Sequence, residues 1–250
     1  MATNALIILI VVFFLTSIIG VVTGSNSLIA VPAMFQFGID PRTAVATNMF
    51  ALVFMSLGGT IPFVRKGAID FRSISPLIVL TIVSSAIGAF LVGIISPGGI
   101  KLIVSAAMIA VVIFTLVSHD KGVGTAAPTA NAVLLTYVLA FALGIYGGLF
   151  SGGYVTVLTA VLVGFGGMRY SEAVASTKLI NVFSSAVATV VFMWQGLVDY
   201  RLGIVLGLTM FVGAYVGAHY VTKINDIWIR RIFLAAVMLL AVKTLVDLFT

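Results

Sequence analysis

Long uncharged apolar runs, separated by short polar segments, make up most of this chain. The first charged residue is Asp40, and most later charges fall between runs of similar length. A helix of about 20 apolar residues crosses the hydrocarbon core of a bilayer. The runs that predict such helices are 5–23, 43–64, 74–96, 100–118, 132–148, 173–195, 202–222 and 229–249. Two shorter apolar arms, 27–38 and 152–166, each follow a glycine-rich polar break. The pattern predicts an all-α polytopic membrane protein.

The composition narrows the class further. Hydrophobic residues make up 62% of the chain and charged residues only 8%, whereas a soluble domain has about 25% charged residues. This excludes an ordinary soluble enzyme and a disordered chain. The chain has no cysteine, and its two histidines, His119 and His219, are far apart in sequence. We therefore expect no disulfide, no metal site and no cofactor.

The two halves of the chain are similar to each other. At a shift of 129 residues, 24 of the 74 ungapped positions 44–117 are identical. The identities include the Gly-x-x-Asp-x-Arg loops 67–72 and 196–201. Duplicated halves with interrupted hydrophobic segments at matching positions are typical of secondary transporters. The predicted organisation is a first repeat over 1–118, a linker over 119–131 and a second repeat over 132–250.

The basic residues indicate how the halves lie across the membrane. If each short arm crosses, each half has five crossings, and the basic residues divide eight to three between the two sides; if the arms re-enter, the division is about five to six. The positive-inside rule favours five crossings. Because five is odd, the halves are predicted to be inverted, with the N-terminus outside. The cytoplasmic side then receives Arg65, Lys66, Arg72, Lys121, Arg169, Lys223, Arg230 and Arg231, and the outer side receives Arg42, Lys101 and Arg201.

The breaks and the helix starts that follow them resemble the TauE/SafE family of sulfite and sulfonate exporters. The resemblance covers nearly the whole chain. It rests on the breaks at 20–27 and 144–153, on the helix starts Ala-Val-Ala-Thr-Asn and Ala-Val-Ala-Ser-Thr, and on the repeated Gly-x-x-Asp-x-Arg loops. The first break has Thr-Gly-Ser-Asn where the family more often has a run of glycines. The resemblance implies export or uptake of small sulfur-containing anions across the inner membrane.

Each break is expected to end one helix and to start another inside the membrane. A helix start exposes unpaired N–H groups and a partial positive charge, so two facing starts would bind a compact oxyanion. Alternatively, the glycines only allow close helix packing, which is the preferred interpretation for Gly203/Gly207 and Gly213/Gly217. The candidate substrate-binding residues are Gly24, Ser25, Asn26, Ser27, Thr47, Asn48, Ser151, Gly152, Gly153, Ser176, Thr177, Lys178 and Asn181.

Lys178 is the most specific candidate, because it lies inside a predicted span. An ammonium at that depth costs at least about 2.5 kcal/mol and normally faces a cavity or a partner. Its counterpart in the first repeat is Met49, so an anion site would be asymmetric. Alternatively, Lys178 extends to the membrane surface, toward Glu172. Arg72 and Arg201 are better explained as interfacial loop residues.

The predicted function is a secondary transporter that moves sulfite or an organosulfonate across the inner membrane, by export through alternating access. The alternatives are an anion channel, an uptake permease for another small oxyanion or carboxylate and, with less support, an intramembrane enzyme. No span carries a Ser/His/Asp set, paired carboxylates or a Walker-type loop, which disfavours an enzyme and an ATP-driven pump. The expected partners are the small anion and the lipid bilayer, with a homodimer left open and no nucleic acid.

Overall fold

The computed structural model describes residues 3–24, 26–65, 71–117 and 129–220, with short stretches at 237–239, 242–244 and 246–247. All regular structure in this part of the chain is helical, which confirms the predicted fold class. The helices are α1 (Thr3–Thr23), α2 (Ser27–Gln36), α3 (Pro41–Arg65), α4 (Phe71–Ile94), α5 (Pro97–Val117), α6 (Ala130–Leu149), α7 (Tyr154–Gly164), α8 (Tyr170–Trp194) and α9 (Tyr200–Tyr220). Most of the predicted linker and of the last predicted span lies outside the described residues.

Seven of the described helices are long and apolar enough to cross a membrane. The two exceptions are α2 and α7, which correspond to the two predicted arms. At 10 and 11 residues, they are about 15–17 Å long, which is roughly half the hydrocarbon thickness. Neither of these helices alone is therefore long enough to cross the hydrocarbon core, and the topology in which both arms cross stays a prediction.

The ends of the helices follow from local sequence. Asp40 accepts hydrogen bonds from the backbone N–H groups of Arg42 and Thr43 at the start of α3, and Asp199 accepts one from Leu202 at the start of α9. Such carboxylates satisfy the unpaired N–H groups of a helix start. The Asp of the second Gly-x-x-Asp-x-Arg loop therefore has a capping role. The corresponding Asp70 lies outside the described residues.

Helices α3 and α8 form the centre of the bundle. Of their membrane-spanning windows, 72% and 56% respectively are buried, compared with 33–44% for the other spans. The two central helices pack against each other, and each also packs against a long helix of the other half, α3 against α9 and α8 against α4. In the same way α1 packs against α9, and α6 against α4. The contacts thus occur in matched pairs when the halves are exchanged, as expected for a duplication.

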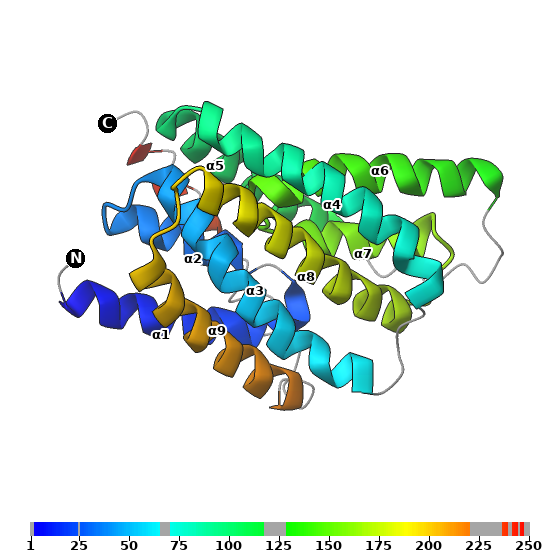
Figure 1. Cartoon of the computed structure of the whole chain (residues 1–250), viewed down its shortest axis with the longest axis horizontal. Helices are drawn as coiled ribbons and strands as arrows, with labels where there is room; N and C mark the ends of the chain where they lie inside the picture. The colour runs from blue at the N-terminus through cyan, green and yellow to red at the C-terminus, as the bar shows by residue number, and fades with distance from the viewer. Residues whose placement is uncertain are drawn as a thin grey trace.

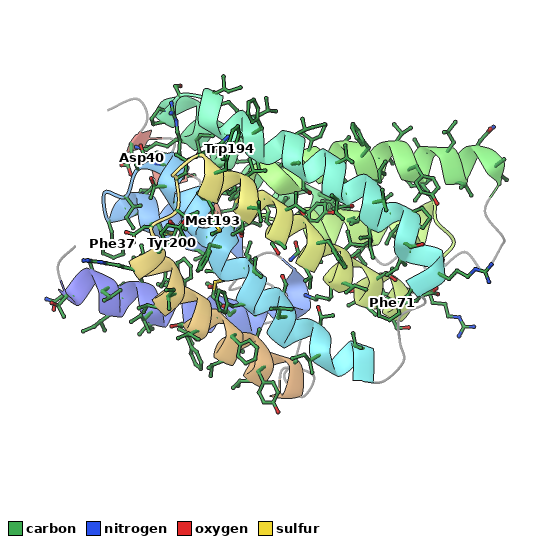
Figure 2. The ribbon with its side chains drawn as sticks, viewed as in Figure 1. Phe37, Asp40, Phe71, Met193, Trp194 and Tyr200 are labelled. Atoms are coloured by element: carbon green, nitrogen blue, oxygen red, sulfur yellow. The ribbon has the colours of Figure 1, made fainter. Side chains whose placement is uncertain are left out.

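The short helices form hairpins with the helices that precede them. In Figure 1, α1 begins at the left end of the bundle and α6 at the right end. Figure 2 shows Phe37, just after α2, at the left with Asp40, whereas Phe71 lies at the right. The hairpin α1–α2 thus enters and leaves at one end. A hairpin that enters and leaves at one end places the following loop on the same side of the membrane as two full crossings would. The predicted eight-to-three division of the basic residues therefore applies to a hairpin as well. The orientation of the halves across a membrane stays a prediction.

The outer surface of the bundle is apolar, with aromatic side chains at the end of α8. Trp194 is the last residue of α8 and is 77% exposed, and its ring stacks on that of Phe90 with centroids 6.4 Å apart. Figure 2 shows Trp194, Met193 and Tyr200 at the same end of the bundle. Such a cluster is typical of the boundary between lipid and water. The buried residues, in contrast, include many Ser, Thr and Asn side chains.

Several glycines allow neighbouring helices to pack closely. A Cβ atom on Gly217 of α9 would lie 2.5 Å from the carbonyl oxygen of Ile18 in α1. A Cβ on Gly207 would lie 2.8 Å from the ring of Phe54 in α3. Small residues at such contacts are the usual device of helix association in lipid. Gly207 and Gly217 thus have a packing role. Gly24 and Gly153 of the two breaks differ from them in having a positive φ.

Candidate functional site

The two helix breaks lie against each other in the interior of the bundle. Gly24, between α1 and α2, has a φ of +71°, and a Cβ there would lie 2.8 Å from the side chain of Val155 in the first turn of α7. A Cβ on Gly152, in the second break, would lie at the same distance from the side chain of Leu28 in the first turn of α2. Each break therefore contacts the helix start of the other half. Only glycine combines a positive φ with such a close approach at low cost.

The second break is held in place by its neighbours. Gly153 has a φ of +79°, and a Cβ there would overlap the side chain of Val111 in α5. The hydroxyl of Tyr146 donates a hydrogen bond to the carbonyl oxygen of Gly152, and the Tyr146 ring makes an edge contact with Phe150. These contacts fix the direction in which α7 begins. The N-cap residue of α2 is Asn26, whose side chain makes no hydrogen bond to the helix start. The N-cap residue of α7 is Gly153, which has no side chain that could cap the helix.

A small cavity lies where the breaks meet α3 and α8. Its volume is about 20 Å³, which holds about one water molecule. A substrate anion could enter only if the lining helices or side chains moved. The lining residues are Gly20, Val21, Gly24, Asn26, Ser27, Leu52, Met55, Ser56, Gly59, Ser151, Val155, Lys178 and Asn181.

Lys178 supplies the positive charge of this cavity. It lies in the ninth position of α8 and is only 7% exposed, so it does not extend to the surface toward Glu172. Within the described part of the chain, its ammonium group has no hydrogen-bond or ion-pair partner. None of the described lining residues is acidic. The charge is thus uncompensated by the side chains around it.

Hydrogen bonds connect the two halves around the cavity. The amide nitrogen of Asn181 donates to the Ser56 hydroxyl at 2.8 Å, and the Ser151 hydroxyl lies 3.5 Å from the Asn181 amide oxygen. The amide nitrogen of Asn26 lies 3.3 Å from the sulfur of Met55. Asn181 therefore links α3, α8 and the second break, whereas Asn26 links the first break to α3.

Three other predicted residues, Thr47, Asn48 and Thr177, do not line the cavity. The Asn48 amide donates to the Ser27 hydroxyl at 2.8 Å. The Thr47 hydroxyl accepts from the backbone N–H of Asp199 at 3.0 Å. The Thr177 and Thr159 hydroxyls are 3.0 Å apart. Thr47 and Thr177 thus contribute to contacts between helices instead of to the cavity.

The remaining predicted site residues do not line the cavity or lie outside the described residues. Ser176 is fully buried, and its hydroxyl has no partner among the described residues. Gly152 and Gly153 shape the second break without lining the cavity. Ser25 lies outside the described residues. Six predicted residues therefore come together at the cavity, namely Gly24, Asn26, Ser27, Ser151, Lys178 and Asn181.

Sequence reasoning missed the contribution of α3. Leu52, Met55, Ser56 and Gly59 line the cavity, and they follow Asn48 at spacings that keep one helical face. That spacing was visible in the sequence, and Ser56 was the polar signal along it. The contact of Val155 with Gly24 had no such signal. No group of three His, Asp or Glu side chains that could bind a metal is present in the described part of the chain.

Comparison with known proteins identifies the chain. The family model described as sulfite exporter TauE/SafE matches residues 9–244. A probable membrane transporter protein, ORF9, of Sinorhizobium sp. is 27% identical, with 99% of this chain and 95% of the relative covered. The probable membrane transporter protein YfcA of Escherichia coli strain K12 is 25% identical, with 95% and 89% covered. No solved structure matches. The match over nearly the whole chain, together with the apolar helices, shows that this multi-pass membrane protein belongs to the TauE/SafE family of membrane transporters.

Proposed function

We propose that this protein is a secondary transporter that binds a small sulfur-containing anion, sulfite or an organosulfonate, in the cavity between the two breaks. The observation that carries the proposal is the ammonium group of Lys178, which is buried, lines the cavity and has no partner in the described chain. A charge at this depth is costly unless it meets an opposite charge. An anionic substrate supplies that charge.

The two helix starts support an oxyanion in particular. The starts of α2 and α7 lie at the cavity, without side-chain caps from Asn26 or Gly153. Helix starts offer N–H donors and a partial positive charge. A sulfite or sulfonate group has three oxygens that can accept from several directions at once, and Lys178 lines the same cavity as these helix starts. The matching family model carries the name of a sulfite exporter.

The narrowness of the cavity favours alternating access over an open channel. With a volume of about 20 Å³, the site admits an anion only after the helices around it move. Broken helices that meet at the interface of two repeats are the usual setting for such movement. The inside-negative potential of an inner membrane drives an anion outward, by about 2.3 kcal/mol per charge per 100 mV. This supports export as the direction.

Ligand binding to the purified protein tests the proposal. Sulfite, thiosulfate, sulfoacetate and taurine are compared with sulfate and acetate by thermal shift, since a ligand that binds the native state raises the melting temperature. We expect a sulfur anion to stabilise the wild type and Lys101→Ala, a control at a loop-side lysine of α5. We expect Lys178→Ala to lose the shift and Lys178→Arg to keep part of it. Equal shifts for the wild type and Lys178→Ala would contradict the proposal.

A further inference from the structure

Asn26 is the amide in the cavity whose hydrogen-bonding capacity is only half used. Its side chain lines the cavity and is 3% exposed. The amide nitrogen faces the sulfur of Met55 at 3.3 Å. The amide oxygen is buried and has no partner among the described residues. A buried acceptor without a donor is unfavourable, so this oxygen is a position where a ligand can contribute binding energy.

Met55 determines which end of the amide is left unpaired. A thioether sulfur accepts hydrogen bonds and cannot donate them. The NH₂ group of Asn26 therefore belongs at the sulfur, and the amide oxygen must point elsewhere. The partner of Asn48 does not determine the orientation of its amide in this way, because that partner is the Ser27 hydroxyl, which can donate or accept. Asn48 also does not line the cavity.

The other amide of the cavity offers a useful contrast. Asn181 uses both ends of its side chain, the nitrogen toward Ser56 and the oxygen toward Ser151. Lys178 lines the same cavity, and its ammonium makes no hydrogen bond to Asn26. The cavity thus presents a positive donor in one half and an unpaired neutral acceptor in the other. A ligand that fills both roles carries acceptor oxygens and, separately, a hydrogen-bond donor.

We propose that Asn26 selects anions that carry a donor, such as the hydroxyl group of a hydroxyalkylsulfonate, over anions that carry acceptors only. This inference rests on the proposed function, because it assumes that a sulfonate group binds beside Lys178. In the complex, the sulfonate oxygens accept from Lys178 and the helix starts. The substrate hydroxyl donates to the amide oxygen of Asn26. A site built around a substrate hydroxyl disfavours the analogue that lacks it, since the buried acceptor is then unpaired.

The test uses two sulfonates of nearly equal size, 2-hydroxyethanesulfonate and propane-1-sulfonate, in which a hydroxyl replaces a methyl group. Calorimetric titration of the purified full chain gives the dissociation constant of each. We expect the wild type to bind the hydroxyl compound about tenfold more tightly, the effect of about one buried hydrogen bond. Asn26→Leu, which has a similar shape and no acceptor, should reduce the ratio to about one and change the affinity for propane-1-sulfonate little.

Two further variants separate selection from a general effect on the fold. Asn181→Leu should weaken both ligands to a similar degree and keep the ratio. Met55→Leu removes the sulfur that orients the amide, so the ratio should fall although Asn26 is still present. This variant also tests the inference if Asn26→Leu does not fold.

Three results would overturn the inference. If the wild type binds both sulfonates equally, water or the protein satisfies Asn26, while the proposed function stands. If the wild type binds neither sulfonate nor sulfite, the proposed function fails as well. If replacing Na⁺ with choline weakens both ligands alike in the wild type and has no effect in Asn26→Leu, the acceptor binds a cation instead of a substrate hydroxyl.

Discussion

The two halves of the chain contribute the same elements to the cavity but different chemistry. Each half provides one helix break and one central helix. From the second half, α8 contributes Lys178 and Asn181; from the first half, α3 contributes Leu52, Met55 and Ser56. The counterpart of Lys178 under the repeat is Met49, which is buried and does not line the cavity. The lining of the cavity thus receives its charged side chain from the second half.

The two halves share the backbone turn at each break but differ in the side chains of their central helices. Both breaks keep a glycine with positive φ at close contact with the rest of the bundle, Gly24 and Gly153, because the chain must turn there in either half. A single anion needs only one full positive charge. The two central helices can therefore differ in side chains while the backbone around them stays alike.

The largest expected effect concerns the inversion of the halves. If they are inverted, residue 2 and residue 125 face opposite sides of the membrane. Since the chain has no cysteine, Ala2→Cys and Thr125→Cys each introduce one reactive thiol without background. A membrane-impermeant maleimide added to intact cells should label Ala2→Cys fully and Thr125→Cys only after permeabilisation. Labelling of both from the same face would remove the inverted repeat.

The next effect tests the charge asymmetry between α8 and α3. Lys178→Met makes the two halves alike, and loss of a charge-assisted contact of about 1.5–3 kcal/mol should weaken anion binding by about 10- to 150-fold. Met49→Leu changes the matching position of α3 and should alter the dissociation constant less than twofold. Titration calorimetry with sulfite measures both. Comparable losses in the two variants would contradict the asymmetry.

The breaks themselves can be compared with a glycine outside the site. Gly24 and Gly38 have similar positive φ angles, +71° and +74°, but a Cβ on Gly38 would meet nothing within 4 Å. Gly38→Ala should cost the backbone strain alone, about 1–3 kcal/mol. Gly24→Ala adds a clash with Val155 and should lower the melting temperature and the transport rate further. If both variants behave alike, the contact between the breaks has no importance.

A smaller effect is expected from the hydroxyls around Asn181. Ser56 and Ser185 correspond under the repeat, yet Ser56 accepts from the Asn181 side chain and Ser185 donates to its backbone oxygen at 2.7 Å. Ser56→Ala frees the amide and should weaken anion binding several-fold, as one neutral hydrogen bond predicts. Ser185→Ala should leave the dissociation constant within about twofold of the wild type. A larger effect at Ser185 would show that the Asn181 side chain is not held by Ser56.

The sequence predicts the helices well because each span is a continuous apolar run. The predicted span 43–64 corresponds to α3 (Pro41–Arg65), and 173–195 lies within a few residues of α8 (Tyr170–Trp194). The breaks were equally visible, because glycine clusters beside polar residues interrupt these runs. Hydrophobicity also limits what sequence reasoning can see, since the lipid-facing and the buried positions of a span are both mostly apolar, and only scattered Ser, Thr and Asn residues mark the buried face.

The facing of individual side chains was therefore harder to predict. Consecutive residues on a helix point about 100° apart, and only neighbouring helices decide which direction meets the cavity. Lys178 and Asn181 face the cavity, whereas Thr177 turns to α7 and Thr47 to the start of α9. Met55 was overlooked because an apolar side chain in an apolar run carries no mark of its contact with Asn26.

The central claim is that an anion crosses by alternating access at the cavity beside Lys178, and counterflow in proteoliposomes tests it most directly. Vesicles loaded with unlabelled sulfite receive radiolabelled sulfite outside, at zero membrane potential. We predict that the wild type transiently accumulates label above equilibrium, that the uptake saturates, and that Lys178→Met abolishes the accumulation. Label that only equilibrates, at a rate proportional to its concentration and unchanged in Lys178→Met, would indicate a pore and contradict the account.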